Sequence, residues 1–166
     1  MSSFATSYIP TVASTVTRAA DQASMQGANF SSWYNQAQGT MYSEHELRSV
    51  TDNYAPWGFV NAPLNNFDLV TTNFRFGTNN ANLSTPSSVG NNKFAGSYSV
   101  AVNNGTHYAS VNGSNIVSVT SNNFITVPTS MTIGQSFGSF YLNGHIRKFS
   151  YYPQALSSAN LVALTS

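Results

Sequence analysis

Charged side chains are scarce in this chain of 166 residues, because lysine, arginine, aspartate and glutamate together make up only 7% of it. An ordinary soluble domain carries about 25%. The net charge is +1 and the six cations are scattered, so the sequence lacks the basic patch with which proteins bind nucleic acid. Asparagine, serine and threonine must therefore keep the surface soluble. Such a surface suits weak glycan contacts or packing against other subunits.

Cysteine is absent altogether, which excludes disulfides, thiolate chemistry and the usual zinc sites. No run approaches the length of about 18 consecutive apolar residues that spans a membrane. Residues 1–10 also lack the apolar stretch of a signal peptide. The content of hydrophobic residues, 41%, argues against disorder, and the length predicts one domain, residues 1–166, with its own core. We predict no cofactor and no membrane contact.

Short segments of β-forming residues, separated by asparagine-rich turns, give the pattern of an all-β sandwich. Bulky and small side chains alternate in residues 93–102, which predicts a half-buried strand. The turn signal Asn112-Gly113 predicts that this strand continues into a three-stranded meander. Phe30 to Tyr34 is predicted to form one helical turn capped by Asn29. The other predicted strands are residues 8–9, 16–18, 40–47, 57–60, 67–71 and 74–76, and a segment that begins at Thr132.

The end of the chain has the clearest pattern. Asn143-Gly144 indicates a tight turn, and residues 145–152 are rich in β-formers and aromatics. Pro153 ends this strand, because proline cannot donate a hydrogen bond to a ladder. Ser157 is placed to cap a short terminal helix with leucines on one face. The apolar positions of the strand break the period of two, and a bulge near Lys148 would restore it.

This order of features resembles the closing segment of concanavalin A-like (laminin G-like) jelly-roll domains, especially those of bacteriophage virion proteins. The residues that carry the resemblance are NGHIR, the aromatics that follow, the proline and the Leu-Ser start of the last helix. SYIPT, VTRAAD and GANFSSWYNQAQGTMY, within residues 7–42, resemble the opening of the same phage-type domain. The resemblance implies an all-β, two-sheet antiparallel jelly-roll sandwich with a short C-terminal helix. It also implies a virion component, assembled in the host cytoplasm.

Two acids, Glu44 and Glu46, flank His45 on a predicted strand, where residues two apart project from the same face at a separation of about 7 Å. Such a pair could be the acid and nucleophile of a glycosidase. The stretch SEHEL, however, lacks the central aspartate and apolar spacers of concanavalin A-like glucanases. We therefore expect two solvated acids and no catalytic residue. The histidines are far apart and the five acids form no cluster, so no metal site is predicted, although a calcium site built from asparagine and carbonyl oxygens remains an alternative.

Trp57, Trp33 and Tyr54 are the candidate glycan-binding residues, since an aromatic ring stacks on the C–H face of a sugar while amides bind its hydroxyls. Trp57 stands between a proline and a glycine, a loop-like neighbourhood, and is the best candidate for an exposed recognition residue. Aromatic residues of a small sandwich more often lie in the core, so a core position is the favoured expectation for both tryptophans and exposure is the alternative. Arg18 and Asp21 are predicted to form a structural ion pair that pins the first strand, with an intersubunit pair as the alternative.

The predicted function is that of a non-enzymatic bacteriophage virion protein. We favour a capsid decoration (cement) protein on the head surface, bound to the major capsid protein as a homo-oligomer, with a trimer as the expected state. The alternative is a tail-fibre or tailspike domain that lies among other tail proteins and binds host surface glycan. The short chain, without an attachment segment before the domain, favours decoration. A glycoside hydrolase and a secreted lectin are the less favoured alternatives.

Overall fold

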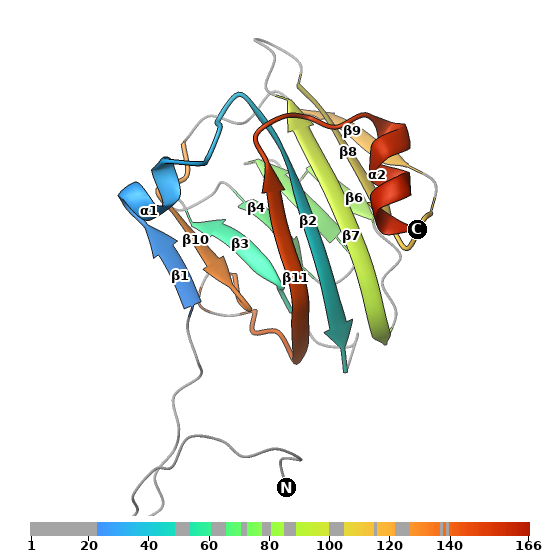
Figure 1. The fold of residues 1–166 in the computed structure, drawn as a ribbon, viewed down its shortest axis with the longest axis horizontal. Coiled ribbons are helices and arrows are strands. Elements are labelled where there is room, and N and C mark those ends of the chain that lie inside the picture. Colours follow the sequence, from blue (N-terminus) through green and yellow to red (C-terminus); the bar gives the residue numbers. More distant parts are fainter. Residues whose placement is uncertain are drawn as a thin grey trace, which may run out of the picture.

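The computed structural model describes residues 23–48, 54–60, 66–70, 73–77, 81–84, 89–99, 105–114, 116–121, 127–136, 138 and 140–166. In these ranges the strands form two sheets (Figure 1). The six-stranded sheet consists, in spatial order, of β1 Ala23–Gln26, β10 Ser130–Ile133, β3 Trp57–Val60, β4 Asn66–Val70, β5 Asn73–Gly77 and β6 Ala81–Ser84. The five-stranded sheet consists of β11 Gly144–Tyr152, β2 Gln38–Leu47, β7 Gly90–Ser99, β8 Gly105–Val111 and β9 Val117–Ser121. The two described helices are α1 Ala28–Ser31 and α2 Ser158–Thr165.

Every pairing between neighbouring strands of these sheets is antiparallel. The predicted architecture of two packed antiparallel sheets with a C-terminal helix is therefore confirmed. The predicted strands at residues 40–47, 57–60, 67–71 and 74–76 correspond to β2 to β5, whereas β1 and β6 were not predicted. The predicted strands at residues 8–9 and 16–18 lie outside the described residues. No described helix is long and apolar enough to cross a membrane.

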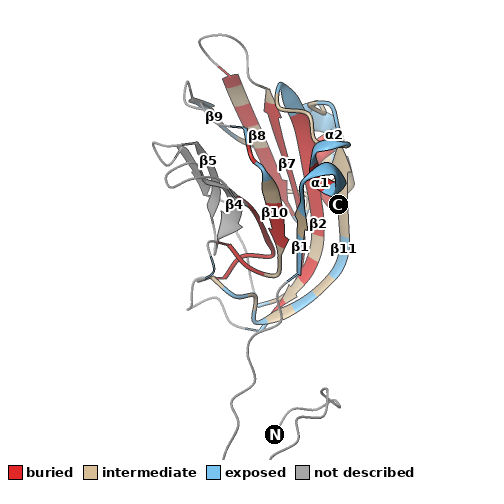
Figure 2. Cartoon of the chain, turned by 90° about the vertical axis from the view of Figure 1, so that its left-hand side faces the viewer, coloured by how far each residue is buried: buried red, intermediate tan, exposed pale blue. Residues whose placement is uncertain are grey.

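The main core fills the space between the two sheets. Because successive side chains of a strand point to opposite faces, every second residue of each strand points inward. Burial of one large apolar side chain contributes roughly 1.5–3 kcal/mol, so this layer is the main source of stability. Figure 2 shows the buried residues along β2, β7 and β8. The core cluster consists of Phe30, Met41, Trp57, Phe59, Phe94, Tyr98, Ala109, Val111 and Met131.

The C-terminal helix α2 lies on the outer face of the five-stranded sheet, the face turned away from the main core (Figures 1 and 2). Leu161 of α2 packs with Tyr42 and Ala95 of the sheet in a second apolar cluster. The Ser157 hydroxyl accepts a hydrogen bond from the backbone N–H of Asn160 at 3.4 Å, which confirms the predicted cap. The helix therefore shields the part of this outer face that β7 and β8 form.

Strand β7 was predicted to be half-buried, but it is buried on both faces. Phe94 and Tyr98 point into the main core, while Ala95 and Ser97 on the opposite face are also buried. The reason is α2, which covers the small residues that the sequence pattern assigned to solvent. Val100, the next bulky residue of the pattern, lies outside the described residues.

The predicted turn at Asn112-Gly113 is confirmed. Both residues have positive φ, 51° and 68°, and the N–H of Ser114 donates to the carbonyl of Val111 at 2.8 Å. Glycine and asparagine tolerate these left-handed angles, which a two-residue hairpin turn requires.

Two other local predictions need correction. Asn143-Gly144 does not form a separate tight turn, because Asn143 is only a bend and Gly144 is already the first residue of β11, where the chain enters the five-stranded sheet. Asn29 lies within α1 and does not cap it. The N-cap is Gly27, with φ 56° and no side-chain hydrogen bond, since the abrupt passage from β1 into α1 requires a left-handed residue.

Candidate functional site

Alternation along β2 places charged side chains on the part of the outer sheet face beside α2. Glu44 and Glu46 point outward, and Arg48 extends this row just beyond the end of the strand, while His45 and Leu47 between them are buried. The predicted placement of both acids on one accessible face is therefore confirmed. On the neighbouring strand β7, Lys93 lies directly opposite Glu44 and adds a cation to the same face.

Strand β11 adds further charges to this face through a β-bulge. Its register against β2 shifts at Arg147, which is the extra residue of the bulge predicted near Lys148. His145 consequently lies opposite Glu46, and Lys148 lies opposite Glu44. On a regular strand, residues three apart point to opposite faces. The bulge therefore brings both His145 and Lys148 to the outer face.

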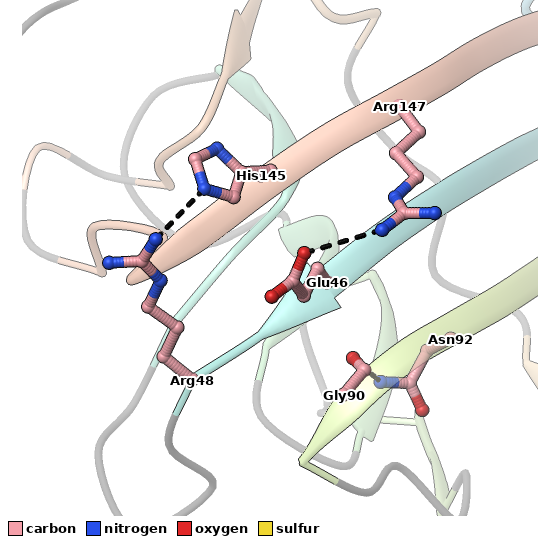
Figure 3. A network of polar contacts seen from close by, with 6 residues as sticks. All are labelled: Glu46, Arg48, Gly90, Asn92, His145 and Arg147. Atoms are coloured by element: carbon pink, nitrogen blue, oxygen red, sulfur yellow. Dashed lines mark hydrogen bonds and ion pairs between the residues drawn. The ribbon is translucent and has the colours of Figure 1, made fainter. Parts of the chain in front are cut away.

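Two polar contacts join β11 to β2 and its end (Figure 3). Nη2 of Arg147 lies 3.4 Å from Oε2 of Glu46 and forms an ion pair. Nη2 of Arg48 lies 3.0 Å from Nε2 of His145, and the guanidinium is the donor of this hydrogen bond. The backbone N–H of Arg48 also donates to the carbonyl of Asn143 at 3.0 Å. Each guanidinium group thus contacts a side chain across the pairing of β2 and β11, near the start of β11.

We call this set of residues the charged face: Glu44, Glu46, Arg48, Lys93, His145, Arg147 and Lys148. It contains every lysine, arginine, aspartate and glutamate whose side chain the structure describes. Lys93 donates to the carbonyl of Ser166, and the Lys148 ammonium lies 5.6 Å from the centre of the Tyr42 ring. An exposed ion pair contributes only about 0–1 kcal/mol to stability. The ion pair on this exposed face therefore contributes little to folding.

Trp57 and Tyr54, two of the three predicted glycan-binding residues, are buried, with 0% and 2% of their surfaces exposed. The candidate role of Trp57 as an exposed recognition residue is wrong. Its ring occupies the favoured core position, at 5.9 to 6.3 Å from the rings of Phe59, Phe94 and Phe149. Strand β3 begins at Trp57 and turns its side chain toward the opposite sheet. Neither residue is available to a ligand on the surface.

Trp33, the third predicted residue, is half-buried beside α1. Its ring packs edge-on against Tyr151 at 4.8 Å and Phe30 at 5.0 Å, and its Nε1 donates to the carbonyl of Asn29 at 2.7 Å. Tyr151 in turn shares hydrogen bonds with Tyr98 and with the backbone of Asn35. Trp33 therefore helps to attach the α1 segment to β11, and the structure does not bring it together with the charged face.

The remaining candidates from the sequence divide into three groups. Arg18 and Asp21 lie outside the described residues, so their ion pair stays a prediction. Among the described residues no three histidine, aspartate or glutamate side chains are grouped to hold a metal ion. His45 and His107 are buried, and burial lowers the pKa of each imidazole to about 4. Only His145 of the three histidines is exposed.

Arg48 and Arg147 are the residues that the sequence analysis did not select. The available signals were the bulge near Lys148 and the outward row that runs from Glu44 to Arg48. What was missing was the pairing of β11 with β2, which brings together residues 97 and 101 positions apart in the chain. With that pairing, alternation alone would have placed the two arginines on one face.

No protein-family model matches the chain, and no curated protein sequence matches it. Solved structures do resemble it. The CBM40 module of the Ruminococcus gnavus IT-sialidase, bound to α2,3-sialyllactose, aligns with a TM-score of 0.62 and 17% identity over 83% of this chain and 88% of that one. The leech intramolecular trans-sialidase, complexed with 2,7-anhydro-Neu5Ac, aligns with a TM-score of 0.67 and 19% identity over 87% of this chain and 26% of that one.

A heptameric SAP-like pentraxin from Limulus polyphemus aligns with a TM-score of 0.55 and 13% identity over 78% of this chain and 70% of that one. None of these three proteins is described as a virion component. What they share with this chain is the packing of two antiparallel sheets. The chain has the concanavalin A-like jelly-roll β-sandwich fold.

Proposed function

We propose that the chain is a non-enzymatic glycan-binding module and that its charged face binds a sugar that carries a carboxylate. The observation that carries the proposal is the pair of exposed side chains Arg48 and Arg147. They come from the ends of two neighbouring strands and contact His145 and Glu46, respectively. A guanidinium presents five N–H donors in a planar fork that matches a carboxylate. Each arginine uses one Nη2 group to contact its partner side chain, and its other N–H groups are available to a ligand.

The neighbouring groups of the charged face suit the rest of a sugar. Glu46 offers carboxylate oxygens as acceptors for hydroxyl groups, and the exposed amide of Asn91, opposite Glu46 on β7, offers both donors and acceptors. Four cations against two anions give the face a positive balance. An acidic sugar is therefore attracted, and its hydroxyls find partners beside the arginines.

The comparisons support this ligand class. The Ruminococcus gnavus module was solved with sialyllactose and the leech enzyme with 2,7-anhydro-Neu5Ac. Both compounds are sialic acid derivatives, and both carry a carboxylate. A carboxylate is the group that the arginine pair of this chain is suited to bind.

Replacing Arg147 by alanine is expected to weaken the binding of α2,3-sialyllactose at least about tenfold, since a hydrogen bond to a charged group contributes about 1.5–3 kcal/mol. Titration calorimetry on both proteins measures the effect. The midpoint of thermal unfolding should stay unchanged, because an exposed ion pair such as that with Glu46 contributes little. Arg147→Lys keeps the charge but loses the planar fork of donors. Its affinity for sialyllactose should therefore lie between those of wild type and Arg147→Ala.

Lactose, which has no carboxylate, is the control ligand, and any binding of lactose should not respond to the loss of Arg147. The proposal is wrong if wild type and Arg147→Ala bind sialyllactose equally. It is also wrong if wild type binds no acidic glycan on an array. Intact sialyllactose at the end of the titration is the expected result for a module without catalysis.

For the biological setting we propose a bacteriophage virion, as the resemblance at both ends of the chain implies. Glycan binding favours the tail-fibre or tailspike role over capsid decoration. The decoration role, the trimer and the virion location stay predictions. Immunogold labelling of the source virion separates the two roles, since label at the tail tip fits an adhesin and label spread over the head fits a cement protein.

A further inference from the structure

A hollow lies between α2 and the end of β11. It has a volume of about 280 Å³ and is lined by Tyr152, Leu156, Asn160, Ala163 and Leu164. We call it the helix hollow. None of the lining residues is charged, in contrast to the charged face on the same side of the sheet.

The floor of the helix hollow is apolar and firmly packed. Tyr152, Leu156 and Leu164 are half-buried and pack against the second apolar cluster of Tyr42, Ala95 and Leu161. A ligand placed here would meet one aromatic ring and aliphatic side chains held by the sheet beneath them. The hollow is therefore formed by side chains that the packing of the fold holds in place.

Two polar groups are available at the helix hollow. Within the part of the chain that the structure describes, neither the Tyr152 hydroxyl nor the Asn160 side-chain amide has a hydrogen-bond partner. The contact of Asn160 with the cap residue Ser157 uses its backbone N–H and leaves its side chain out. The hydroxyl and the amide together offer donors and acceptors above an apolar floor.

We propose that the helix hollow is a second saccharide subsite that takes an uncharged pyranose. A pyranose has an apolar C–H face, which suits the Tyr152 ring and the leucines, and hydroxyl groups at its edge, which suit the hydroxyl and amide. Small-molecule pockets are mostly apolar with a few polar groups, and their volumes begin at about 300 Å³. A hollow of this size holds one sugar residue. A charged sugar would lose water without gaining an ionic partner, so the ligand is neutral.

The helix hollow continues the charged face along the same strand. Lys148 and Tyr152 both lie on the outer side of β11, opposite Glu44 and Thr40 of β2. They are four residues apart, which corresponds to about 13 Å at the rise of an extended strand. One acidic glycan with neutral residues could therefore bind at both places and gain affinity from the linkage. The linked arrangement depends on the proposed function, whereas binding of a neutral sugar at the hollow does not.

The test uses an array of neutral oligosaccharides, and the best binder is then titrated by NMR against the full chain. We expect amide shifts in α2 and at the end of β11. Asn160→Ala and Tyr152→Phe should each weaken binding about fivefold, the effect of losing one hydrogen bond. Asn160→Ala favours the helix and keeps the cap, so folding is preserved. Gln154→Ala, which removes an exposed amide outside the hollow, is the matched control and should bind like wild type.

The outcome separates the two proposals. Arg147→Ala should bind the neutral sugar with the affinity of wild type and should lose its affinity for free N-acetylneuraminic acid. Asn160→Ala should keep its affinity for N-acetylneuraminic acid and bind the neutral sugar more weakly. If no acidic sugar binds at all, the neutral titration still tests the hollow. The proposal of a subsite is wrong if no neutral sugar on the array binds. It is also wrong if Asn160→Ala and Tyr152→Phe both bind the neutral sugar with the affinity of wild type.

Discussion

Lowering the pH from 7 to 4.5 is expected to reduce the free energy of unfolding by about 5 kcal/mol, because two buried histidines resist protonation. His45 and His107 are each 1% exposed, and burial lowers the pKa of each imidazole from 6.5 to about 4. The unfolded chain takes up these protons near pH 6.5, and the folded chain takes them up only near pH 4. Between these values the unfolded state binds more protons, so stability falls as the pH falls through this window.

Urea unfolding at a series of pH values between 7.5 and 4.5 measures this loss. Replacing His45 by glutamine should remove about half of the loss, because each of the two imidazoles contributes a similar share. His145→Gln is the matched control, since the His145 side chain is exposed, and this variant should keep the full loss. Equal stability of wild type at pH 7 and 4.5 would contradict the burial of two neutral imidazoles.

The loss of stability at low pH also affects the charged face, because His45 lies between Glu44 and Glu46 on β2. Its Nδ1 is 3.2 Å from the Ser43 hydroxyl, and its Nε2 has no hydrogen-bond partner among the described residues. A proton on Nε2 would therefore add a buried charge without an acceptor. Binding of acidic glycans should accordingly be lost together with folding at low pH.

Most of the fold follows from local signals in the sequence. The strand β11, its end at Pro153 and the cap of α2 at Ser157 each depend on residues a few positions apart, and all three are confirmed. The bulge at Arg147 was also visible, because it repairs a broken alternation within one strand. Alternation and turn chemistry are properties of short segments, which is why a single sequence reveals them.

The candidate site depended on pairing between distant segments, which local patterns do not encode. The placement of Trp57 also depends on a contact between distant segments. Its neighbour Gly58 indicated a loop, yet a Cβ at Gly58 would lie 2.7 Å from the Ser136 hydroxyl, so the glycine reflects close packing between segments. Ser136 is far from Gly58 in the sequence, and no local pattern could reveal the contact. The loop-like neighbourhood that made Trp57 a candidate for recognition therefore included a glycine that is needed for packing in the core.

Replacing Gly144 by alanine is expected to lower the free energy of unfolding by about 3 kcal/mol or more, the upper range for overpacking. A Cβ at this position would overlap the backbone carbonyl oxygen of Glu46. That oxygen belongs to β2, which is held between β11 and β7, and Gly144 itself is paired with Leu47. Neither strand can move away without breaking the start of the pairing. Urea unfolding at pH 7 measures the loss.

Asn143→Ala is the control for this substitution, because Asn143 is exposed and its backbone carbonyl still accepts the N–H of Arg48. A change of less than about 0.5 kcal/mol is expected for such a surface residue. If Gly144→Ala is as stable as wild type, β11 does not begin against β2 at this residue.

The same substitution separates the two binding sites. Gly144 begins the strand that carries His145 and Arg147, so displacing this end of β11 moves both residues away from Arg48 and Glu46. Under conditions in which Gly144→Ala remains folded, we expect it to lose affinity for acidic glycans and to retain neutral sugar at the helix hollow, which adjoins the opposite end of β11. Loss of both ligands would indicate that the whole fold has opened. Retention of both would contradict a charged face that depends on this end of the strand.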